Sequence, residues 1–499
     1  MSIAAAVVLL AALVLVAAVA RLALMRNPMT YTAYLKRSSR RLKSDGAIAA
    51  TGTGELPDSP QPRVLVIGAG FSGLAMCAAL KRHGIPFDCV ERAHGVGGNW
   101  LHGTYDNVHI ISSRKTTEYK DFPMPESYPD FPSRDQVLAY LESYAAHFKL
   151  NEHIRFNTEV SSIEPAERQP GFWKVSIDGG LDGQREEKVY GGVFLCNGHH
   201  WDMRFASYPG PFTGDVIHSK QYKSPSSLAG KRVLVIGGGN SACDIAVEAG
   251  RIGAASHISM RRGYWFLPRT IAGIPAVEII RPWVPIWAQR LLIRAFVKLS
   301  IGSYTSYGLQ VPDHKIWDHH PTINTELLHY LKLGKIAPHS DITRFAEKTV
   351  FFSDGTSCEV DLIVHATGFN VSLKPLRSDL VATEVSPHNG RTYFQLVDGM
   401  FPIDQRNLYV VGIGQPRYGA GSLLTVVTEL AAEMHLLQPS VSRPVGSLLA
   451  AVGGKRLAQK KCVDAHLIDP IDAFNKCLLV LGIVPHLAKI DRLLQLIGR

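Results

Sequence analysis

The chain of 499 residues is long enough for two or three compact domains, and its 46% hydrophobic and 19% charged residues indicate an ordered globular protein. The net charge of +10 is concentrated near the N-terminus, where seven basic residues lie between Arg21 and Lys43. No basic repeat with interleaved aromatic residues follows, which argues against a nucleic-acid-binding protein. Seven cysteines without a Cys-x-x-Cys pair indicate reduced thiols and exclude the dithiol of a disulfide reductase.

An uncharged apolar run, Ile3–Ala20, lies at the start of the sequence. It is long enough to cross a bilayer, which takes about 17–25 residues, so residues 1–25 are predicted to form a transmembrane anchor. A cleaved signal peptide is the alternative, because Ala18-Val19-Ala20 has the small-x-small form, but no positive charge precedes the run and the basic cluster follows it. Since basic segments stay in the cytosol, we expect a single-pass membrane protein whose main domains face the cytosol, joined to the anchor by a basic, flexible linker over residues 26–61.

The first glycine-rich turn follows a short apolar strand predicted over residues 64–67. Gly68, Gly70 and Gly73 have the G-x-G-x-x-G spacing and open a predicted helix. The first glycine permits a tight turn, the second lets a pyrophosphate approach the backbone, and the third lets helix and strand pack closely. Glu91 ends the next strand, 23 residues after Gly68, where a carboxylate can accept hydrogen bonds from ribose hydroxyls. Together these features predict a dinucleotide site.

A second glycine-rich turn begins 169 residues after the first. The residues in and beside it are Gly237, Gly239, Asn240, Ser241 and Ala242. No acid ends the strand that follows; Arg261 and Arg262 stand there. A guanidinium at this position suits the 2′-phosphate of NADP, so NADP is favoured over NAD. The alternative is that both arginines are simply exposed to solvent.

Further apolar strands that lead into glycine are predicted at 361–369 and 408–414. The layout indicates an α/β fold with two nucleotide-binding Rossmann-like domains, in which the second interrupts the first. Two different dinucleotides indicate FAD at the first turn and NADPH at the second, as in flavoprotein reductases and flavoprotein monooxygenases. The predicted divisions are 62–225 and 336–440 for the FAD-binding domain, 226–335 for the NADP-binding domain, and 441–499 for a C-terminal amphipathic segment.

A string of Phe212, Gly214, His218 and Tyr222 lies between the two turns. It matches, without a gap, the fingerprint of the flavin-containing and Baeyer–Villiger class of monooxygenases, and the chain resembles that family over roughly residues 62–435. Four further motifs of the family stand in the expected order: GVGGNW at 95–100, YPDFPSRDQVLAYLESYAAHF at 128–148, GGGNSACD at 237–244 and HATGF at 365–369.

The resemblance implies an NADPH-dependent FAD monooxygenase. In such an enzyme NADPH reduces FAD, O2 forms a C4a-hydroperoxyflavin, and one oxygen atom passes to the nitrogen or sulfur of a lipophilic small molecule. Three alternatives stay open: Baeyer–Villiger oxidation of a ketone, a flavoprotein reductase that passes electrons to a protein partner, and a tethered binding protein without turnover. The resemblance adds Gly98, Trp100, Thr367 and Gly368 to the cofactor-binding residues predicted above.

In this family the string marks the junction between the FAD and NADP domains. A histidine at such a hinge can hydrogen-bond across two domains, so His218 is predicted to couple the domains rather than to transfer a proton; a buried, fully hydrogen-bonded histidine at a turn is the alternative. Animal-type members carry an asparagine in the loop corresponding to 110–123, whereas this chain has Ser112, Ser113 and Arg114 there, closer to the plant-type pattern. No catalytic residue is therefore assigned, and the substrate class stays open.

Two segments outside these motifs carry further expectations. Over 284–302, basic residues recur every four positions on one face and apolar residues cover the other. The segment is either an ordinary surface helix or a helix that lies in a membrane interface or lids an apolar entrance. The histidines and aspartates at 313–320 fit no standard set of metal ligands, and no metal site is predicted. The expected partners are O2, a lipophilic small molecule and the membrane, while the oligomeric state is left open.

Overall fold

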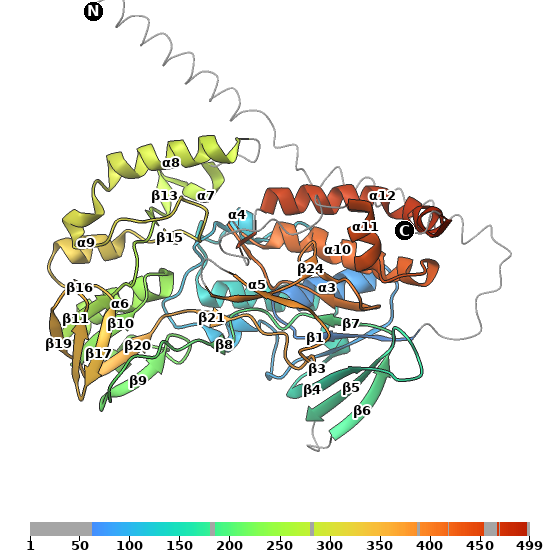
Figure 1. Ribbon diagram of the computed structural model, residues 1–499, viewed down its shortest axis with the longest axis horizontal. Helices are drawn as coiled ribbons and strands as arrows, with labels where there is room; N and C mark the ends of the chain where they lie inside the picture. Colours follow the sequence, from blue (N-terminus) through green and yellow to red (C-terminus); the bar gives the residue numbers. More distant parts are fainter. Residues whose placement is uncertain are drawn as a thin grey trace, which may run out of the picture.

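The computed structural model describes residues 62–179, 185–279, 284–386, 390–417, 419–453, 467–468 and 470–496. The predicted anchor and linker, residues 1–61, lie outside these ranges. Within them, no helix combines the length and the apolar character needed to span a bilayer. The described residues form two parallel sheets, each with helices on one face and a small antiparallel sheet on the other (Figure 1).

The first sheet is parallel, in the order β26 (Leu408–Val410), β7 (Val193–Leu195), β1 (Val64–Ile67), β2 (Phe87–Val90) and β3 (Ile154–Arg155). Successive side chains of β1 point to opposite faces, so Val64 and Leu65 enter different hydrophobic clusters. The Val64 face packs against α3 (Phe71–Arg82), α5 (Arg134–His147) and α10 (Gly421–Leu437). The Leu65 face packs against the antiparallel strands β4 (Thr158–Pro165), β5 (Trp173–Gly179) and β6 (Arg185–Tyr190).

The second sheet repeats this plan, in the order β16 (Ala337–His339), β11 (Ala255–Ser259), β10 (Arg232–Ile236), β20 (Leu362–His365) and β9 (Asp215–His218). Val233 and Leu234 of β10 enter different clusters, as the period of two requires. The Val233 face packs against α6 (Asn240–Ile252) and α9 (Glu326–Lys332). The Leu234 face packs against the antiparallel meander β17 (Ile342–Ala346), β18 (Thr349–Phe352) and β19 (Ser357–Glu359).

Along the chain, the second sheet interrupts the first, as predicted, but the strand pairing does not coincide with the boundaries predicted at 225/226 and 335/336. The prediction assigned β9, β16 and β20 to the FAD-binding domain, whereas all three belong to the second sheet, which draws its strands from residues 215–365. A buried parallel strand is apolar whichever sheet it joins, so the sequence pattern did not distinguish the two sheets.

The chain crosses between the two sheets twice, and these crossings are bonded to each other. β8 (Asp202–Met203) pairs antiparallel with β21 (Phe369–Asn370). Beside this pair, the backbone N–H of Arg204 donates to the Gly368 carbonyl at 3.1 Å, and the Thr367 hydroxyl donates to the Arg204 carbonyl. The two domains are therefore joined by a paired ribbon, called the junction ribbon below, rather than by two independent linkers.

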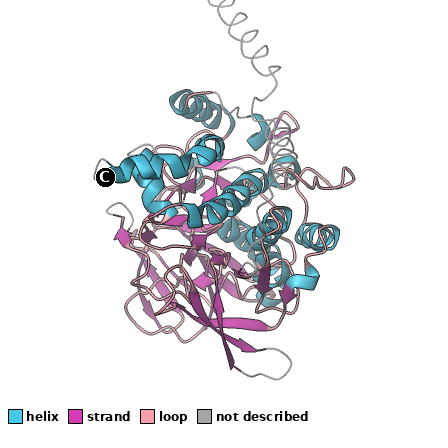
Figure 2. Cartoon of the chain, turned by 90° about the vertical axis from the view of Figure 1, so that its right-hand side faces the viewer, coloured by secondary structure: helices cyan, strands magenta, loops and turns pink. Residues whose placement is uncertain are grey.

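The C-terminal segment packs on the first domain as α11 (Val445–Gly453) and α12 (Pro470–Leu496). α12 buries Phe474 and Leu487 beside α10, and it leaves Leu479, Leu493 and Leu496 exposed. Apolar side chains therefore lie on both its buried and its exposed sides, and the amphipathic character predicted for 441–499 stays a prediction. Figure 2 shows that helices gather on one side of the molecule and strands on the other.

The remaining α-helices and strands of the described part lie outside the two main sheets. They are α4 (Arg114–Thr117), α7 (Ala276–Ile279), α8 (Ile286–Ser300), β12 (Phe266–Leu267), β13 (Thr270–Ile271), β14 (Ile274–Pro275), β15 (Thr322–Ile323), β22 (Thr383–Val385), β23 (Thr392–Phe394), β24 (Leu396–Val397), β25 (Phe401–Pro402), β27 (Gln415–Pro416) and β28 (Leu467–Ile468). Helix α8 lies within the segment 284–302 that the sequence singled out.

Candidate functional site

A cavity of about 1420 Å³ lies between the two sheets, at the carboxyl ends of their strands. Such a position is where open α/β sheets bind ligands. Ligand pockets commonly measure about 300–1,000 Å³, so this cavity has room for more than one ligand. The predicted cofactor-binding residues that line it are Gly68, Gly70, Glu91, Gly98, Trp100, Gly237, Gly239, Asn240, Ser241, Arg261, Arg262, Thr367 and Gly368. Gly73 does not line the cavity, because its role is in packing.

The first glycine turn has the backbone that its spacing predicts. Gly68 has a φ of +99°, and a Cβ there would lie 2.7 Å from the carbonyl oxygen of Cys196. A Cβ on Gly73 would lie 1.7 Å from the Gly68 oxygen, because α3 passes close to the turn. At Gly70 the nearest atom to a Cβ is Gly98 Cα at 3.4 Å, and both residues line the cavity. No side chain caps the N-terminus of α3, so its first N–H groups are open to an anionic group.

Glu91 follows β2 and is buried beside this turn. Its Oε2 accepts a hydrogen bond from the backbone N–H of Ala69 at 2.7 Å, and its Oε1 accepts one from Ala93 at 2.9 Å. Each carboxylate oxygen keeps a further lone pair, and the residue lines the cavity. Glu91 therefore braces the glycine turn and can still accept hydrogen bonds from ribose hydroxyls.

The second glycine turn has the same geometry. Gly237 has a φ of +133°, and a Cβ there would lie 2.4 Å from the carbonyl oxygen of Ala366. A Cβ on Gly239 would meet no atom within 4 Å, and no side chain caps α6, so open space lies before this helix N-terminus. Asn240 has a structural contact, since its Oδ1 accepts from a backbone N–H of β15 at 2.8 Å. The turn fits a pyrophosphate held by backbone N–H groups and by the neighbouring Ser241.

Arg261 and Arg262 line the cavity beyond β11, the strand that follows the second turn. The guanidinium of Arg262 lies over the ring of Tyr264, 5.5 Å from its centroid, and donates to His319 Nε2 at 2.8 Å. Arg261 is exposed and Arg262 is half-buried. The alternative of two solvent-exposed arginines therefore describes Arg261 alone. Both side chains line the cavity, and their contact with a 2′-phosphate stays a prediction.

His218 is fully buried at the end of β9 and does not line the cavity. Its Nδ1 accepts from the backbone N–H of Lys220 at 3.1 Å, so in the neutral ring Nε2 carries the proton, which it donates to the Gly368 carbonyl at 3.0 Å. Burial lowers the pKa of His218 and keeps the ring neutral. The side chain thus binds the backbone beside the junction ribbon, and it does not reach the space available to ligands.

The other residues of the string, Phe212, Gly214 and Tyr222, contact neighbouring elements of the second domain. Phe212 lies 5.6 Å from the ring of Phe345, and a Cβ on Gly214 would lie 2.6 Å from the Asp361 carbonyl oxygen. At the other end, the Tyr222 hydroxyl donates to the Glu248 carboxylate on α6.

A polar contact between the two domains surrounds Tyr222, and sequence reasoning missed it. Tyr105, from the first domain, donates to Asp244 Oδ2 at 2.8 Å, and its ring lies 5.6 Å from that of Tyr222. Asn107 donates to Glu248 Oε1 at 2.7 Å. Both acids lie on α6, within the GGGNSACD motif or just beyond it. Their spacing of four residues on a helix that opens a cofactor turn was the available signal.

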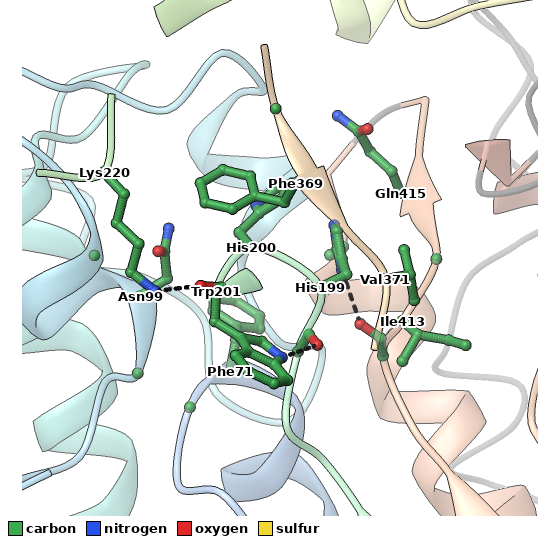
Figure 3. A pocket seen from close by; sticks show the side chains of 18 of the residues that line it. Phe71, Asn99, His199, His200, Trp201, Lys220, Phe369, Val371, Ile413 and Gln415 are labelled. Carbon is green, nitrogen blue, oxygen red and sulfur yellow. Dashed lines mark hydrogen bonds between the residues drawn. The ribbon is translucent and has the colours of Figure 1, made fainter. Parts of the chain in front are cut away.

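The cavity wall along the junction ribbon holds further polar and aromatic side chains that the sequence analysis did not select (Figure 3). His199 Nδ1 lies 3.2 Å from the Gly412 carbonyl oxygen, and Lys220 donates to the Trp201 carbonyl at 3.1 Å. Burial lowers the pKa of Lys220 to about 8, helped by the nearby Arg92. The residues of this wall follow the carboxyl end of β7, so the position of the GHHW run after a strand could have revealed them.

In the loop predicted to differ from animal-type relatives, Ser112, Ser113 and Arg114 lie in different surroundings. Ser112 lines the cavity and its Oγ lies 2.6 Å from Thr117 Oγ1. Ser113 is fully buried and caps α4, while Arg114 donates to the carbonyl oxygen of Pro125 at 3.2 Å. Only Ser112 of the three therefore faces the space available to ligands.

The family model described as flavin-binding monooxygenase-like matches residues 61–434. The chain belongs to this family. Flavin-containing monooxygenase 5 of Homo sapiens is 31% identical over 383 residues, and flavin-containing monooxygenase 2 of Homo sapiens is 33% identical over 380 residues. Each alignment covers 71% of this chain and 69% of the relative. As a flavin-binding monooxygenase-like protein, the chain is an NADPH- and O2-dependent oxidoreductase with FAD and NADPH as cofactors, as predicted.

Solved structures share the fold of this flavin-binding monooxygenase-like protein. Cyclohexanone monooxygenase from Rhodococcus sp. Phi1, bound to NADP+, has a TM-score of 0.66 and 16% identity, covering 86% of this chain and 98% of that chain. S-allyl-L-cysteine S-oxygenase from Allium sativum has a TM-score of 0.59 and 22% identity, covering 87% and 94%. The predicted α/β fold is thereby confirmed, whereas the predicted transmembrane helix lies outside the described residues.

Proposed function

We propose that this protein transfers one oxygen atom of O2 to a nitrogen or sulfur atom of a lipophilic small molecule. The shape of the cavity carries the proposal: both glycine turns open into it, and a further part of its wall is apolar. That part is formed by Met400, Leu423, Leu424, Val427, Ile468, Ala473 and Cys477. A lipophilic molecule is stabilised against such a wall by about 25 cal/mol for each Å² of apolar surface removed from water.

The residues present fit both cofactors. The turn at Gly68 and Gly70 would hold the pyrophosphate of FAD, and Glu91 its ribose. The turn at Gly239 would hold the pyrophosphate of NADPH, with Arg261 beside the 2′-phosphate. When bound, the flavin supplies the activation of O2 and NADPH supplies the electrons.

The chain itself orients these groups across the junction between its domains. His218 fixes the junction ribbon through Gly368, and Tyr222 fixes the first domain's contact with α6. Lys220 adds a cation at the cavity wall at neutral pH, since its pKa of about 8 keeps most of it protonated. A junction fixed by these hydrogen bonds would hold donor and acceptor at a set separation.

Relatives support oxygen transfer to nitrogen or sulfur. Dimethylaniline monooxygenase [N-oxide-forming] 2 of Pan troglodytes is 33% identical over 380 residues, whereas cyclohexanone monooxygenase is 16% identical. Baeyer–Villiger oxidation is therefore the second candidate. A reductase that serves a protein partner is disfavoured, because electron transfer to a partner needs no apolar wall beside the cofactor sites.

Isotope labelling tests the proposal. The FAD-loaded protein is given NADPH, 18O2 and one of three probes: N,N-dimethylaniline, a dialkyl thioether or cyclohexanone. We expect one labelled oxygen in the amine or thioether product for each NADPH consumed. A labelled lactone alone would support the Baeyer–Villiger candidate, and NADPH consumption without labelled product for any probe would contradict oxygen transfer. A Gly70→Val variant, which should lack FAD, is the control.

We also propose that residues 3–20 anchor the protein in a membrane, with both nucleotide domains in the cytosol. The length of the run and the basic cluster after it support this topology. The outward side of α8 supports a membrane nearby: Trp287, Leu291 and Leu299 are 69%, 64% and 88% exposed. The basic residues Arg294 and Lys298 are exposed on the same side. Arg290 instead points inward and donates to Asp318 at 2.7 Å.

Protease protection tests this topology. Protease added to sealed, right-side-out vesicles should leave the main domains intact, because they lie inside. Digestion without permeabilisation would reverse the topology. A mature chain that begins near Arg21 would instead support the signal-peptide alternative.

A further inference from the structure

A cluster of two histidines and a cysteine lies in the second domain, away from the large cavity. His257 lies on β11, His339 ends β16 and Cys358 lies on β19. One candidate ligand atom from each residue lies within 4.8 Å of the other two. None of the three lines the large cavity, and the oxygenation proposed above uses none of them.

The imidazole of His339 is held with Nε2 toward the cluster. Its ring stacks on Phe352, with centroids 4.0 Å apart and planes at 10°. Its Nδ1 lies 3.3 Å from Thr356 Oγ1, and its Nε2 lies 3.0 Å from His257 Nδ1. A histidine that binds a metal through one nitrogen and hydrogen-bonds through the other has this arrangement.

We propose that His257, His339 and Cys358 form a zinc site, with water as the fourth ligand. Two imidazole nitrogens and one thiolate are a donor set that zinc prefers. In tetrahedral zinc sites such ligand atoms stand about 3.3–3.6 Å apart, which lies between the 3.0 Å separation of the two histidines and the 4.8 Å limit of the cluster. Small side-chain movements therefore suffice to bind the ion.

One of the three proposed ligands borders a second cavity, and a bound ion would have a structural effect. His339 also borders a smaller cavity of about 330 Å³, together with Asp354 and Ser340. Bound zinc would link β11, β16 and β19, and so clamp the β17–β19 meander to the edge of the parallel sheet. The Ser259 hydroxyl donates to the Ser340 carbonyl at 2.6 Å, so the clamp lies next to the strand end that leads to Arg261.

Binding releases one proton. The Cys358 thiol loses its proton to solvent as the zinc–sulfur bond forms, and the proton shared between His257 and His339 moves to the outer nitrogen of His257.

Zinc binding to the FAD-loaded full chain tests the proposal. The protein is titrated with Zn²⁺ in competition with a chromophoric chelator, and the bound ion is characterised by X-ray absorption. We expect about one zinc per chain, with two nitrogens at about 2.0–2.1 Å and one sulfur at about 2.3 Å. Thr356→Val should weaken binding about tenfold by removing the contact to His339.

Variants of the ligands decide the outcome. His339→Asn and Cys358→Ser should each weaken binding more than tenfold, while His147→Asn, at an exposed histidine of the first domain, should leave it unchanged. FAD content and far-ultraviolet circular dichroism verify that each variant is folded, and His257→Asn replaces any variant that is not. Equal binding by wild type and folded ligand variants would overturn the proposal, as would a sulfur-free zinc shell.

Discussion

Replacing Arg261 tests coenzyme recognition with little structural disturbance. Arg261 is exposed where it lines the cavity, whereas Arg262 also stacks on Tyr264 and donates to His319. We expect Arg261→Ala to weaken NADPH binding and to leave NADH binding unchanged, because only NADPH carries the 2′-phosphate.

The structure sets the expected size of the effect. A hydrogen bond to a charged group contributes about 1.5–3 kcal/mol, and the exposure of Arg261 places it at the low end because water screens the charge. A loss of about 1.5 kcal/mol raises the dissociation constant about tenfold. Arg262→Ala should reduce the binding free energy of NADPH by up to about 3 kcal/mol, which raises its dissociation constant roughly 150-fold. The variant should also weaken NADH binding to a smaller extent, since the contacts with Tyr264 and His319 are lost too.

Dissociation constants of both coenzymes are measured on the FAD-loaded protein by fluorescence titration at one ionic strength. Arg251→Ala is the matched control: Arg251 lies on α6, pairs with Glu326 and does not line the cavity. Neither constant should change in that variant. If Arg261→Ala weakened NADPH and NADH equally, the arginine would support the fold rather than bind the phosphate, and the reasoning for NADP at this turn would be wrong.

Three further changes probe other parts of the structure. Gly70→Val puts a branched side chain where a pyrophosphate must approach, so the protein should fold without retaining FAD, and a yellow, FAD-loaded variant would contradict the site. Tyr222→Phe removes a donor to the buried carboxylate of Glu248 and should lower the free energy of unfolding by about 1.5–3 kcal/mol, measured with urea; an unchanged midpoint would refute this contact. Burial lowers the pKa of His83, but its hydrogen bond to Glu429 and that charge outweigh burial and raise it above 6.5. Protonated His83 therefore stabilises the fold below pH 6.5, and the free energy of unfolding should fall as the pH rises through the raised pKa. His83→Gln should abolish this fall. If the fall persisted in that variant, the reasoning would be wrong.

The cofactor turns could be predicted from the sequence because their physics is local. In each turn a strand, three small residues and a helix follow one another within a short stretch, and the positive φ of Gly68 and Gly237 and the closeness of Gly73 to Gly68 follow from that order alone. Glu91 and Arg261 stand at the ends of the next strands, so their place beside the turns is also set by the local βαβ unit.

Contacts between distant segments were beyond the sequence pattern. The hydrogen bond from Asn107 to Glu248 joins residues 141 positions apart, and nothing in either neighbourhood marks the other. The same limit explains why the predicted domain boundaries do not coincide with the strand pairing. The sequences of β9 and β20 have the apolar pattern of any buried strand, which does not say which sheet a strand joins. The outward side of α8 is a further case: it exposes Leu291 and Leu299 together with Arg294 and Lys298, and an amphipathic pattern does not say which residues meet the core.

The sequence by itself determined the two nucleotide turns, the family resemblance and the cofactors, because each depends on residues close together in the chain. Tertiary structure alone decided that both turns open into one cavity with an apolar wall, that His218 is sealed away from it, and that His257, His339 and Cys358 meet. The physical reason is that burial and proximity depend on how helices and strands pack together. Each element packs against segments that are distant in the chain and that its own sequence does not specify.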